Sequence, residues 1–299
     1  MRKAPALLLS AGLLMATLTG CAPTSAADSC VPTAPDGAAS TLIDVSGSFG
    51  SAPQVDFPTP VKAQQTERAL VIAGDDDGPV LTGNQSVRMA LAMYDGETGE
   101  PVPGAAYGEP AVYATSQLNP EITKGLECAT PGSRIAMTVP QGDQAAILVA
   151  DIFDVFLAKA DGADRPVLQP GLPSVVTAAD GTPGLTIPKS DPPKELAVAV
   201  LKEGDGETVS KASRMIVHYT GALWSERTIF DSSWQNGSPA TFSPEEIIPG
   251  FATALVGKQV GSQILVVIPP ELGYGEQANA TIPANSTLVF VVDILGTLP

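Results

Sequence analysis

The chain has 299 residues, a length that suits two domains of ordinary size better than one. Hydrophobic residues make up 44% and charged residues 16%, and the 29 glycines and 28 prolines indicate many turns and extended segments. The 16 basic and 32 acidic residues give a net charge of −16, which argues against nucleic acid as a partner. A single histidine and three cysteines argue against a zinc site, and we expect neither a metal nor a cofactor.

Residues 1–20 have the pattern of an export signal. Arg2 and Lys3 precede an apolar run that is too short and wrongly flanked to span a membrane. The run ends in Leu18-Thr19-Gly20-Cys21, which resembles the lipobox of bacterial lipoproteins. This resemblance implies cleavage after Gly20, acylation of Cys21 with palmitate, and a lipid anchor at the extracytoplasmic face of the cell membrane. The alternative is an ordinary secretory signal in which Cys21 falls by chance.

Residues 21–40 are rich in Pro, Thr, Ser, Ala and Gly, and we expect them to form a flexible tether. With Cys21 assigned to lipid, Cys30 and Cys128 remain in an oxidising compartment. They either form one disulfide, which would join the tether to the first domain, or remain as two free thiols. No later stretch is long and apolar enough to cross a bilayer, so the sequence predicts an anchored protein.

The rest of the chain contains an internal repeat. Four short matches occur in the same order at similar offsets: 52–58 with 182–188, 121–126 with 246–251, 132–140 with 261–269, and 148–151 with 288–291. We interpret them as two copies of one unit, at 41–165 and 196–299, separated by a proline-rich leader or linker at 166–195. The second copy has a long loop between Pro269 and Leu288 that the first lacks, so an active site is expected there.

Within each copy the periodicity is that of strands. Met215, Val217 and Tyr219 alternate with Ile216, His218 and Thr220, and runs near 263–268 and 287–292 are rich in β-branched residues. One short helix is predicted between Pro249 and Val256. The fold class is therefore α+β, with a curled antiparallel sheet (a half barrel) over one short helix in each copy.

The second copy resembles an FKBP-type peptidyl-prolyl cis-trans isomerase, or rotamase, over about 100 residues. The resemblance rests on stretches that occur in the family's order and spacing: Val217-His218-Tyr219-Thr220-Gly221, Phe230-Asp231-Ser232-Ser233, Ile247-Ile248-Pro249-Gly250-Phe251, Ile268-Pro269-Pro270-Glu271-Leu272-Gly273-Tyr274-Gly275, Ile282-Pro283 and Leu288-Val289-Phe290. It implies an enzyme that accelerates X-Pro isomerisation during folding of exported proteins, with proline-containing polypeptides as clients and macrolides as inhibitors.

The resemblance also assigns roles to residues of a proline-binding pocket. Tyr219, Asp231, the backbone N–H of Ile248 and the Tyr274 hydroxyl are expected to contact the rotating bond, and the walls to be formed by Phe230, Ile247, Phe251, Ile282 and Phe290. In the family the floor is often tryptophan, where this chain has Phe251. A further wall aromatic aligns with Ala240, which leaves open whether Phe242 compensates.

Isomerisation about an amide bond makes and breaks no covalent bond, so it needs no nucleophile, metal or proton shuttle. His218 alternates away from the face of Tyr219 and is expected to be structural. The first copy matches Tyr94 to Tyr219 and Leu126 to Phe251 but lacks Phe-Asp-Ser-Ser, and we expect it to be a degenerate, inactive FKBP-like domain. The alternative function is a non-catalytic, chaperone-like lipoprotein that holds polypeptides; a solute-binding lipoprotein is a weaker third.

Overall fold

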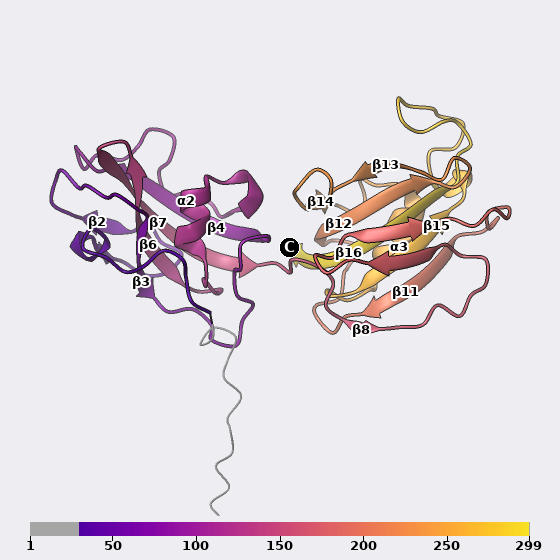
Figure 1. Ribbon diagram of the computed structural model, residues 1–299, viewed down its shortest axis with the longest axis horizontal. Coiled ribbons are helices and arrows are strands. Elements are labelled where there is room, and N and C mark those ends of the chain that lie inside the picture. Colours follow the sequence, from indigo (N-terminus) through magenta and orange to yellow (C-terminus); the bar gives the residue numbers. More distant parts are fainter. Residues whose placement is uncertain (1–29, 299) are drawn as a thin grey trace, which may run out of the picture.

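The computed structural model describes residues 30–298, which form two units side by side (Figure 1). The export signal and Cys21 lie outside the described residues. The first unit comprises residues 30–155 and the second residues 158–298. Each contains one main antiparallel sheet, a separate two-stranded hairpin and one two-turn helix, which confirms the α+β prediction.

The first unit is built on a five-stranded sheet of order β3-β6-β7-β4-β5. Its central strands β6 and β7 are buried along most of their length and are joined by a tight turn in which Gly142 has a φ of 65°. The elements are η1 Ser40–Leu42, β1 Asp44–Ser46, β2 Gln54–Asp56, β3 Glu67–Ile72, β4 Ser86–Asp95, β5 Ala111–Ala114, η2 Thr115–Gln117, α2 Pro120–Leu126, β6 Arg134–Gln141 and β7 Gln144–Val155.

The second unit repeats this arrangement in a sheet of order β13-β12-β16-β15-β11-β8, with β14 also paired to β12. The segment between its two central strands, 269–287, replaces the tight turn of the first unit. The elements are β8 Ala163–Asp164, β9 Ser174–Thr177, β10 Pro183–Thr186, β11 Ala197–Glu203, β12 Arg214–Leu223, β13 Thr228–Ser232, β14 Ala240–Phe242, α3 Pro249–Leu255, β15 Gln263–Ile268, η3 Pro270–Leu272 and β16 Leu288–Leu298.

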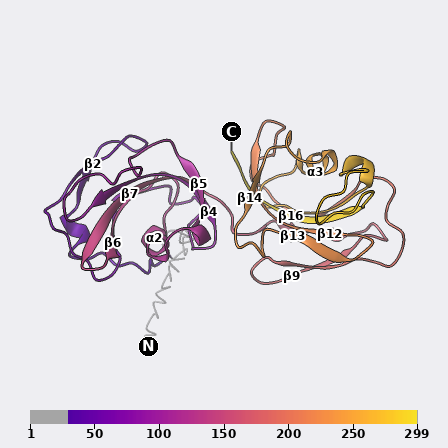
Figure 2. The same cartoon turned by 90° about the horizontal axis from the view of Figure 1, so that it is seen from above.

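Both faces of each sheet are covered. Figure 2 shows α3 on one side of the second sheet and β9 on the other, and α2 and β2 on opposite sides of the first. The leaders therefore fold back as hairpins, β1–β2 and β9–β10, on the face that the helix leaves free. Phe251, Ala254 and Leu255 give α3 one apolar stripe toward the sheet, and Pro249 suits its first turn.

A shared irregularity aligns the two sheets residue by residue. A β-bulge follows Arg88 in β4 and Ile216 in β12, in both cases opposite the last strand of the unit. Counted from the bulge, Leu91 occupies the position of Tyr219. The predicted correspondence of Tyr94 with Tyr219 is therefore wrong. Tyr94 is three positions further on, on the opposite face of the strand, where its ring contacts that of Phe57 edge-on at 6.4 Å.

The helices and last strands require similar corrections. Since α2 and α3 both have seven residues and start at proline, Ile122 and not Leu126 corresponds to Phe251. In the last strands, Leu148 and not Ala150 occupies the place of Phe290, because the two lie opposite equivalent positions of β6 and β15. The match of the two leaders holds, since both become the second strand of a covering hairpin.

The two units meet at a short joint rather than at a linker. The Phe156 N–H donates to the Ser86 carbonyl of the first unit, while the Leu157 N–H donates to the Leu295 carbonyl of the second. The Phe156 ring packs against Gly296, where any side chain would collide with it. The segment 166–195, predicted as a leader or linker, lies entirely on the second unit and contains β9 and β10.

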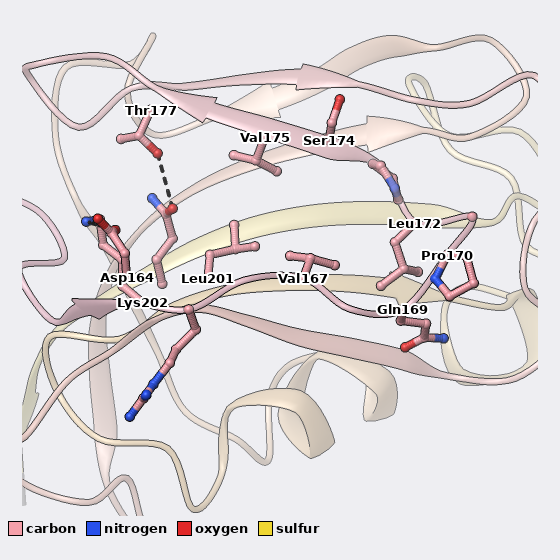
Figure 3. Close-up of a pocket in the computed structure, with 14 residues that line it drawn as sticks. Asp164, Val167, Gln169, Pro170, Leu172, Ser174, Val175, Thr177, Leu201 and Lys202 are labelled. Carbon is pink, nitrogen blue, oxygen red and sulfur yellow. Dashed lines mark hydrogen bonds and ion pairs between the residues drawn. The ribbon is translucent and has the colours of Figure 1, made fainter.

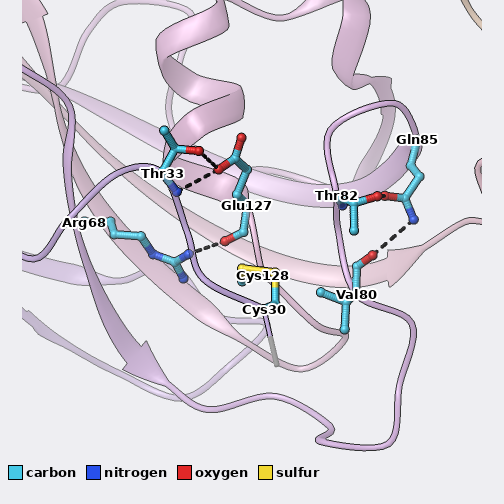
Figure 4. The surroundings of a disulfide bond; sticks show 8 residues. All are labelled: Cys30, Thr33, Arg68, Val80, Thr82, Gln85, Glu127 and Cys128. Atoms are coloured by element: carbon cyan, nitrogen blue, oxygen red, sulfur yellow. Dashed lines mark hydrogen bonds between the residues drawn. A yellow bond between two sulfur atoms is a disulfide. The ribbon is translucent and has the colours of Figure 1, made fainter. Parts of the chain in front are cut away.

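Residues 30–40 are not a flexible tether. Ala34, Ala39 and Ser40 are buried against the first unit, because the segment contacts β3 and its start is bonded covalently to the helix α2 region. Cys30 and Cys128 form a disulfide with a Cα–Cα distance of 5.6 Å, which resolves the two alternatives left by the sequence (Figure 4). Thr33 adds a hydrogen bond from its N–H to Glu127, 2.8 Å long.

Candidate functional site

An open pocket of about 340 Å³ lies in the second unit between the sheet and the start of α3. Its walls come from β12, β13, the segment from β14 into α3, the segment after η3, and β16. The residues that line it are Tyr219, Phe230, Asp231, Phe242, Glu246, Ile247, Ile248, Phe251, Tyr274 and Phe290. Eight of the nine residues predicted from the sequence are in this set, so the structure brings together side chains from 219 to 290 in the chain.

The apolar part of the pocket is a chain of aromatic rings in edge-on contact. Phe290 contacts Phe251 at 4.9 Å and Phe230 at 5.6 Å between ring centroids, with interplanar angles of 80° and 90°. Phe242 contacts Phe251 at 5.9 Å and 82°. Such edge-to-face pairs hold one another in place. Phe251 and Phe290 are only 3% and 6% exposed, so they form a rigid apolar base for a ligand.

The polar part is centred on Asp231. The Tyr219 hydroxyl donates to one carboxylate oxygen, and the Asn236 amide donates to the other at 3.3 Å. Both donors are uncharged. Burial, followed by the hydrogen bond to Asp231, raises the pKa of Tyr219 above its ordinary value, so the hydroxyl stays protonated and remains a donor.

The start of α3 provides a backbone donor. Ile248 caps the helix, and its carbonyl accepts from the N–H groups of Phe251 and Ala252. Within residues 30–298 its own N–H has no hydrogen-bond acceptor, as expected for the end of a helix. Tyr274 reaches the same pocket from the segment after η3 and is 41% exposed.

The structure departs from the predicted pocket at Ile282, and it shows that Phe242 supplies the wall aromatic that Ala240 lacks. Ile282 is not among the residues that line the pocket: it is 3% exposed and packs in the same hydrophobic core as Phe251 and Phe290, and its N–H donates to the Asn279 side chain at 2.8 Å. Phe242 lines the pocket where Ala240 does not. Phe242 lies opposite Met215 across the strands, on the face that carries the core, so strand alternation could have identified it.

Two polar residues were missed by the sequence reasoning. Glu246 lines the pocket, and Asn236 holds Asp231. The sequence did contain an indication of Glu246, because the acidic pair Glu245-Glu246 directly precedes the apolar pocket residues Ile247-Ile248. Nothing in the sequence pointed to Asn236, because its role depends on how the turn after β13 folds back.

Comparisons with known proteins identify the family of the second unit. Residues 205–295 match the family model described as FKBP-type peptidyl-prolyl cis-trans isomerase. The chain is 32% identical over 118 residues to the FK506-binding protein of Streptomyces anulatus, of which it covers 95% with 38% of its own length. The chain belongs to the FKBP family.

Other FKBP relatives are covered less fully. The chain is 45% identical over 104 residues to the FKBP-type 22 kDa peptidyl-prolyl cis-trans isomerase of Escherichia coli (strain K12), which corresponds to 34% of this chain and 50% of that protein. The first curated relatives are thus matched over half of their length or less. Among solved structures, the crystal structure of FkpA from Escherichia coli shares 33% identity with a TM-score of 0.34, over 44% of this chain and 54% of that chain.

The two FKBP-like units differ at the centre of the pocket. Gly221 in β12 faces Phe230 and Phe290, and a Cβ atom there would lie 2.6 Å and 2.8 Å from their rings. The equivalent position in β4 is Met93, whose side chain packs against the first core. In the first unit Leu91 replaces the pocket tyrosine. In the first unit, aliphatic side chains therefore occupy the positions that surround the open pocket of the second unit.

A larger cavity lies elsewhere, on the face of the second FKBP unit away from α3. It has a volume of about 770 Å³ and lies between the segment 164–175 and β11 (Figure 3). Its charged residues are already paired: Lys202 with Asp164 at 2.6 Å, and Arg165 with Glu203. Thr177 donates to Gln263 at 3.2 Å across it. None of the pocket aromatics contributes to it.

His218 is structural, as the strand alternation indicated. Its ring is 6% exposed and stacks on Trp234 at 3.8 Å, and its Nδ1 lies 2.8 Å from the Ser233 hydroxyl. Burial lowers the pKa of His218 to about 4, so the ring is neutral at physiological pH. Within residues 30–298 no group of three His, Cys, Asp or Glu side chains is arranged to hold a metal ion.

Proposed function

We propose that the second FKBP unit catalyses cis-trans isomerisation of X-Pro bonds in exported polypeptides, with the proline ring bound in the aromatic pocket. The observation that carries the proposal is the pocket itself: an apolar base of edge-on aromatic rings with uncharged donors at its rim. Family membership supports the same activity.

The chemistry follows from amide resonance. Rotation about the peptide bond faces a barrier of about 18–20 kcal/mol because the planar form has partial double-bond character. The charge-separated resonance form is weakened in an apolar pocket, whereas the twisted amide is less polar. Each tenfold acceleration requires about 1.4 kcal/mol, so several kcal/mol from desolvation and hydrogen bonding accelerate isomerisation by orders of magnitude.

The rim residues would orient the chain during rotation. The free Ile248 N–H would donate to a substrate carbonyl, and the Tyr274 hydroxyl is a second donor from the facing segment. Tyr219 and Asp231 would form the polar side of the pocket next to the rotating bond. None of these groups has to transfer a proton.

The proposed location is the extracytoplasmic face of the cell membrane, through a lipid on Cys21. Its support is the sequence Leu18-Thr19-Gly20-Cys21 and the disulfide between Cys30 and Cys128, which suits an oxidising compartment. In the described part of the chain no helix has the length and hydropathy needed to cross a bilayer. Metabolic labelling with palmitate tests the anchor: label lost in Cys21→Ser supports it, and label retained there refutes it.

The first unit is proposed to be an inactive copy that spaces the active unit from the membrane or holds polypeptide. This proposal is supported by the aliphatic residues Leu91, Met93 and Leu148 at the positions of Tyr219, Gly221 and Phe290.

NMR exchange spectroscopy on an Ala-Pro peptide tests the activity in the full chain. We expect acceleration that falls at least tenfold in Phe290→Ala and in Gly221→Ala, which closes the pocket without removing any of its walls. Gly108→Ala is the matched control, since its Cβ would have only one neighbour, at 3.9 Å. Unchanged exchange with intact peptide binding would favour the non-catalytic holding function, and full activity in both Phe290→Ala and Gly221→Ala would refute this pocket as the catalytic site.

A further inference from the structure

The rim of the pocket carries negative charge without a compensating cation. Asp231 and Glu246 both line it, and none of the lining residues is Lys or Arg. Among the ion pairs of residues 30–298 none involves either carboxylate. The two groups that contact Asp231, the Tyr219 hydroxyl and the Asn236 amide, orient the carboxylate and leave its charge intact.

Three basic side chains of the second unit have their place at other sites. Lys202 pairs with Asp164, while Arg214 and Arg227 line two other cavities. Charges of one sign around a cleft with apolar walls concentrate their field at its mouth and attract ligands of opposite charge. We therefore expect the pocket to select ligands by their positive charge as well as by their shape.

We propose that the preferred clients carry Lys or Arg within two residues of the proline, and that Asp231 and Glu246 determine this preference. The inference rests on the proposed isomerase function. An extended chain advances about 3.3–3.6 Å per residue, so a flanking lysine or arginine lies within reach of the rim carboxylates when proline occupies the aromatic base. A flanking Glu would meet the same carboxylates as a like charge.

The test compares three peptides of the form Xaa-Ala-Pro-Ala-Xaa in which both Xaa are Lys, norleucine or Glu. With the full chain in about 50 mM salt, we expect kcat/KM to decrease from Lys to norleucine to Glu, with a total range of about three- to tenfold. In about 0.5 M salt the range should shrink, because exposed charges are screened. NMR exchange spectroscopy measures all three peptides without a coupling protease.

Two variants assign the preference to the rim. Glu246→Gln removes one charge, and Asn236→Arg places a cation beside the outer Asp231 oxygen while the bond from Tyr219 is retained. Each should reduce the Lys-to-Glu ratio to about its square root, and together they should abolish it. The matched control is Glu226→Gln, which removes an exposed carboxylate that lines a different cavity and should leave the ratio unchanged.

The outcomes separate this inference from the proposed function. If none of the three peptides is accelerated, the isomerase function itself is wrong. If all three are accelerated equally, or if the ratio persists in the Glu246→Gln and Asn236→Arg double variant, the isomerase function stands and the charge preference is refuted. Circular dichroism of each variant shows whether the fold is retained.

Discussion

Two titratable groups lie opposite each other across β12 and β16, and we expect them to give the second unit opposing dependences of stability on pH. His218 and Asp293 are register partners, 6% and 2% exposed. Asp293 accepts from the Gln263 amide and from the Ala160 N–H, both at 2.8 Å, and has no cation in contact among the described residues. Replacing either by Asn removes its titration while preserving a polar side chain at the position.

Titration of Asp293 should decrease the free energy of unfolding of the second unit as pH rises. Burial raises its pKa from 3.8 to about 6, against the smaller opposing effect of its two hydrogen bonds and of Lys202 and Lys159. Between about pH 4 and 6 the folded state keeps a proton that the unfolded chain has released, so the free energy of unfolding falls with increasing pH. A shift of about 2 units corresponds to about 3 kcal/mol, lost in full above pH 6.

His218 should have the opposite effect. Burial lowers its pKa from 6.5 to about 4, so in this window the unfolded chain binds a proton that the folded state does not. The free energy of unfolding therefore rises between about pH 4 and 6.5. We take about 2 kcal/mol for this gain, less than the full shift, because the Ser233 hydroxyl at Nδ1 can also accept a hydrogen bond from the charged ring and so lowers the cost of charging it.

Urea unfolding followed by tryptophan fluorescence measures these slopes selectively. The chain has two tryptophans, Trp224 and Trp234, and both are in the second unit. Between pH 4 and 6.5 we expect the wild type to lose about 1 kcal/mol, His218→Asn to lose about 3, and Asp293→Asn to gain about 2. Other carboxylates contribute the same background to all three proteins. Equal slopes in the three would refute the reasoning.

Three further predictions concern the scaffold. Cys128→Ser opens a disulfide with Cys30 across 98 residues and should cost the first unit about 4 kcal/mol, seen by calorimetry without a change in the tryptophan transition. Asp151→Ala should cost about 3–5 kcal/mol in the same unit, because it leaves Arg134 buried without its partner at 2.5 Å; calorimetry checks this too. Gly296→Ala should force the joint between the units apart and cost about 1–3 kcal/mol, with a change in the small-angle scattering profile that a well-tolerated alanine would not produce.

The pocket was predictable because its residues occur in short, ordered stretches with strand periodicity. Alternation fixes the pocket face of Tyr219 in β12 and of Phe290 in β16. Phe230 and Asp231 are adjacent in β13 and both line the pocket, because the register shifts there by one residue; their place was indicated by the family resemblance and not by periodicity. Ile282 was placed wrongly because it lies in the long segment 269–287, where no periodicity indicates direction. The turn that brings Asn236 to Asp231 is also irregular, so its contact could not be read from the sequence.

Errors in aligning the repeat had different consequences in helices and strands. Matching Leu126 instead of Ile122 to Phe251 is an error of one helical turn, which keeps the side chain on the same face. Matching Tyr94 to Tyr219 is an error of an odd number of positions in a strand, which reverses the face. A tyrosine that the sequence placed in a degenerate pocket therefore packs under the leader hairpin instead.

The two units also show how one fold accommodates different side chains at the centre of its sheet. Arg134 and Asp151 in the first unit occupy the positions of Gln263 and Asp293 in the second, so a buried ion pair replaces an uncompensated carboxylate at the same place in the sheet. Met93 replaces Gly221 on the opposite face, where only a residue without a Cβ atom leaves room between Phe230 and Phe290. Neither exchange alters the strand order or the covering helix, because each is absorbed by side chains within one sheet. A glycine in a central strand usually weakens a sheet, and here it marks the place where the Phe230 and Phe290 rings approach the backbone closely.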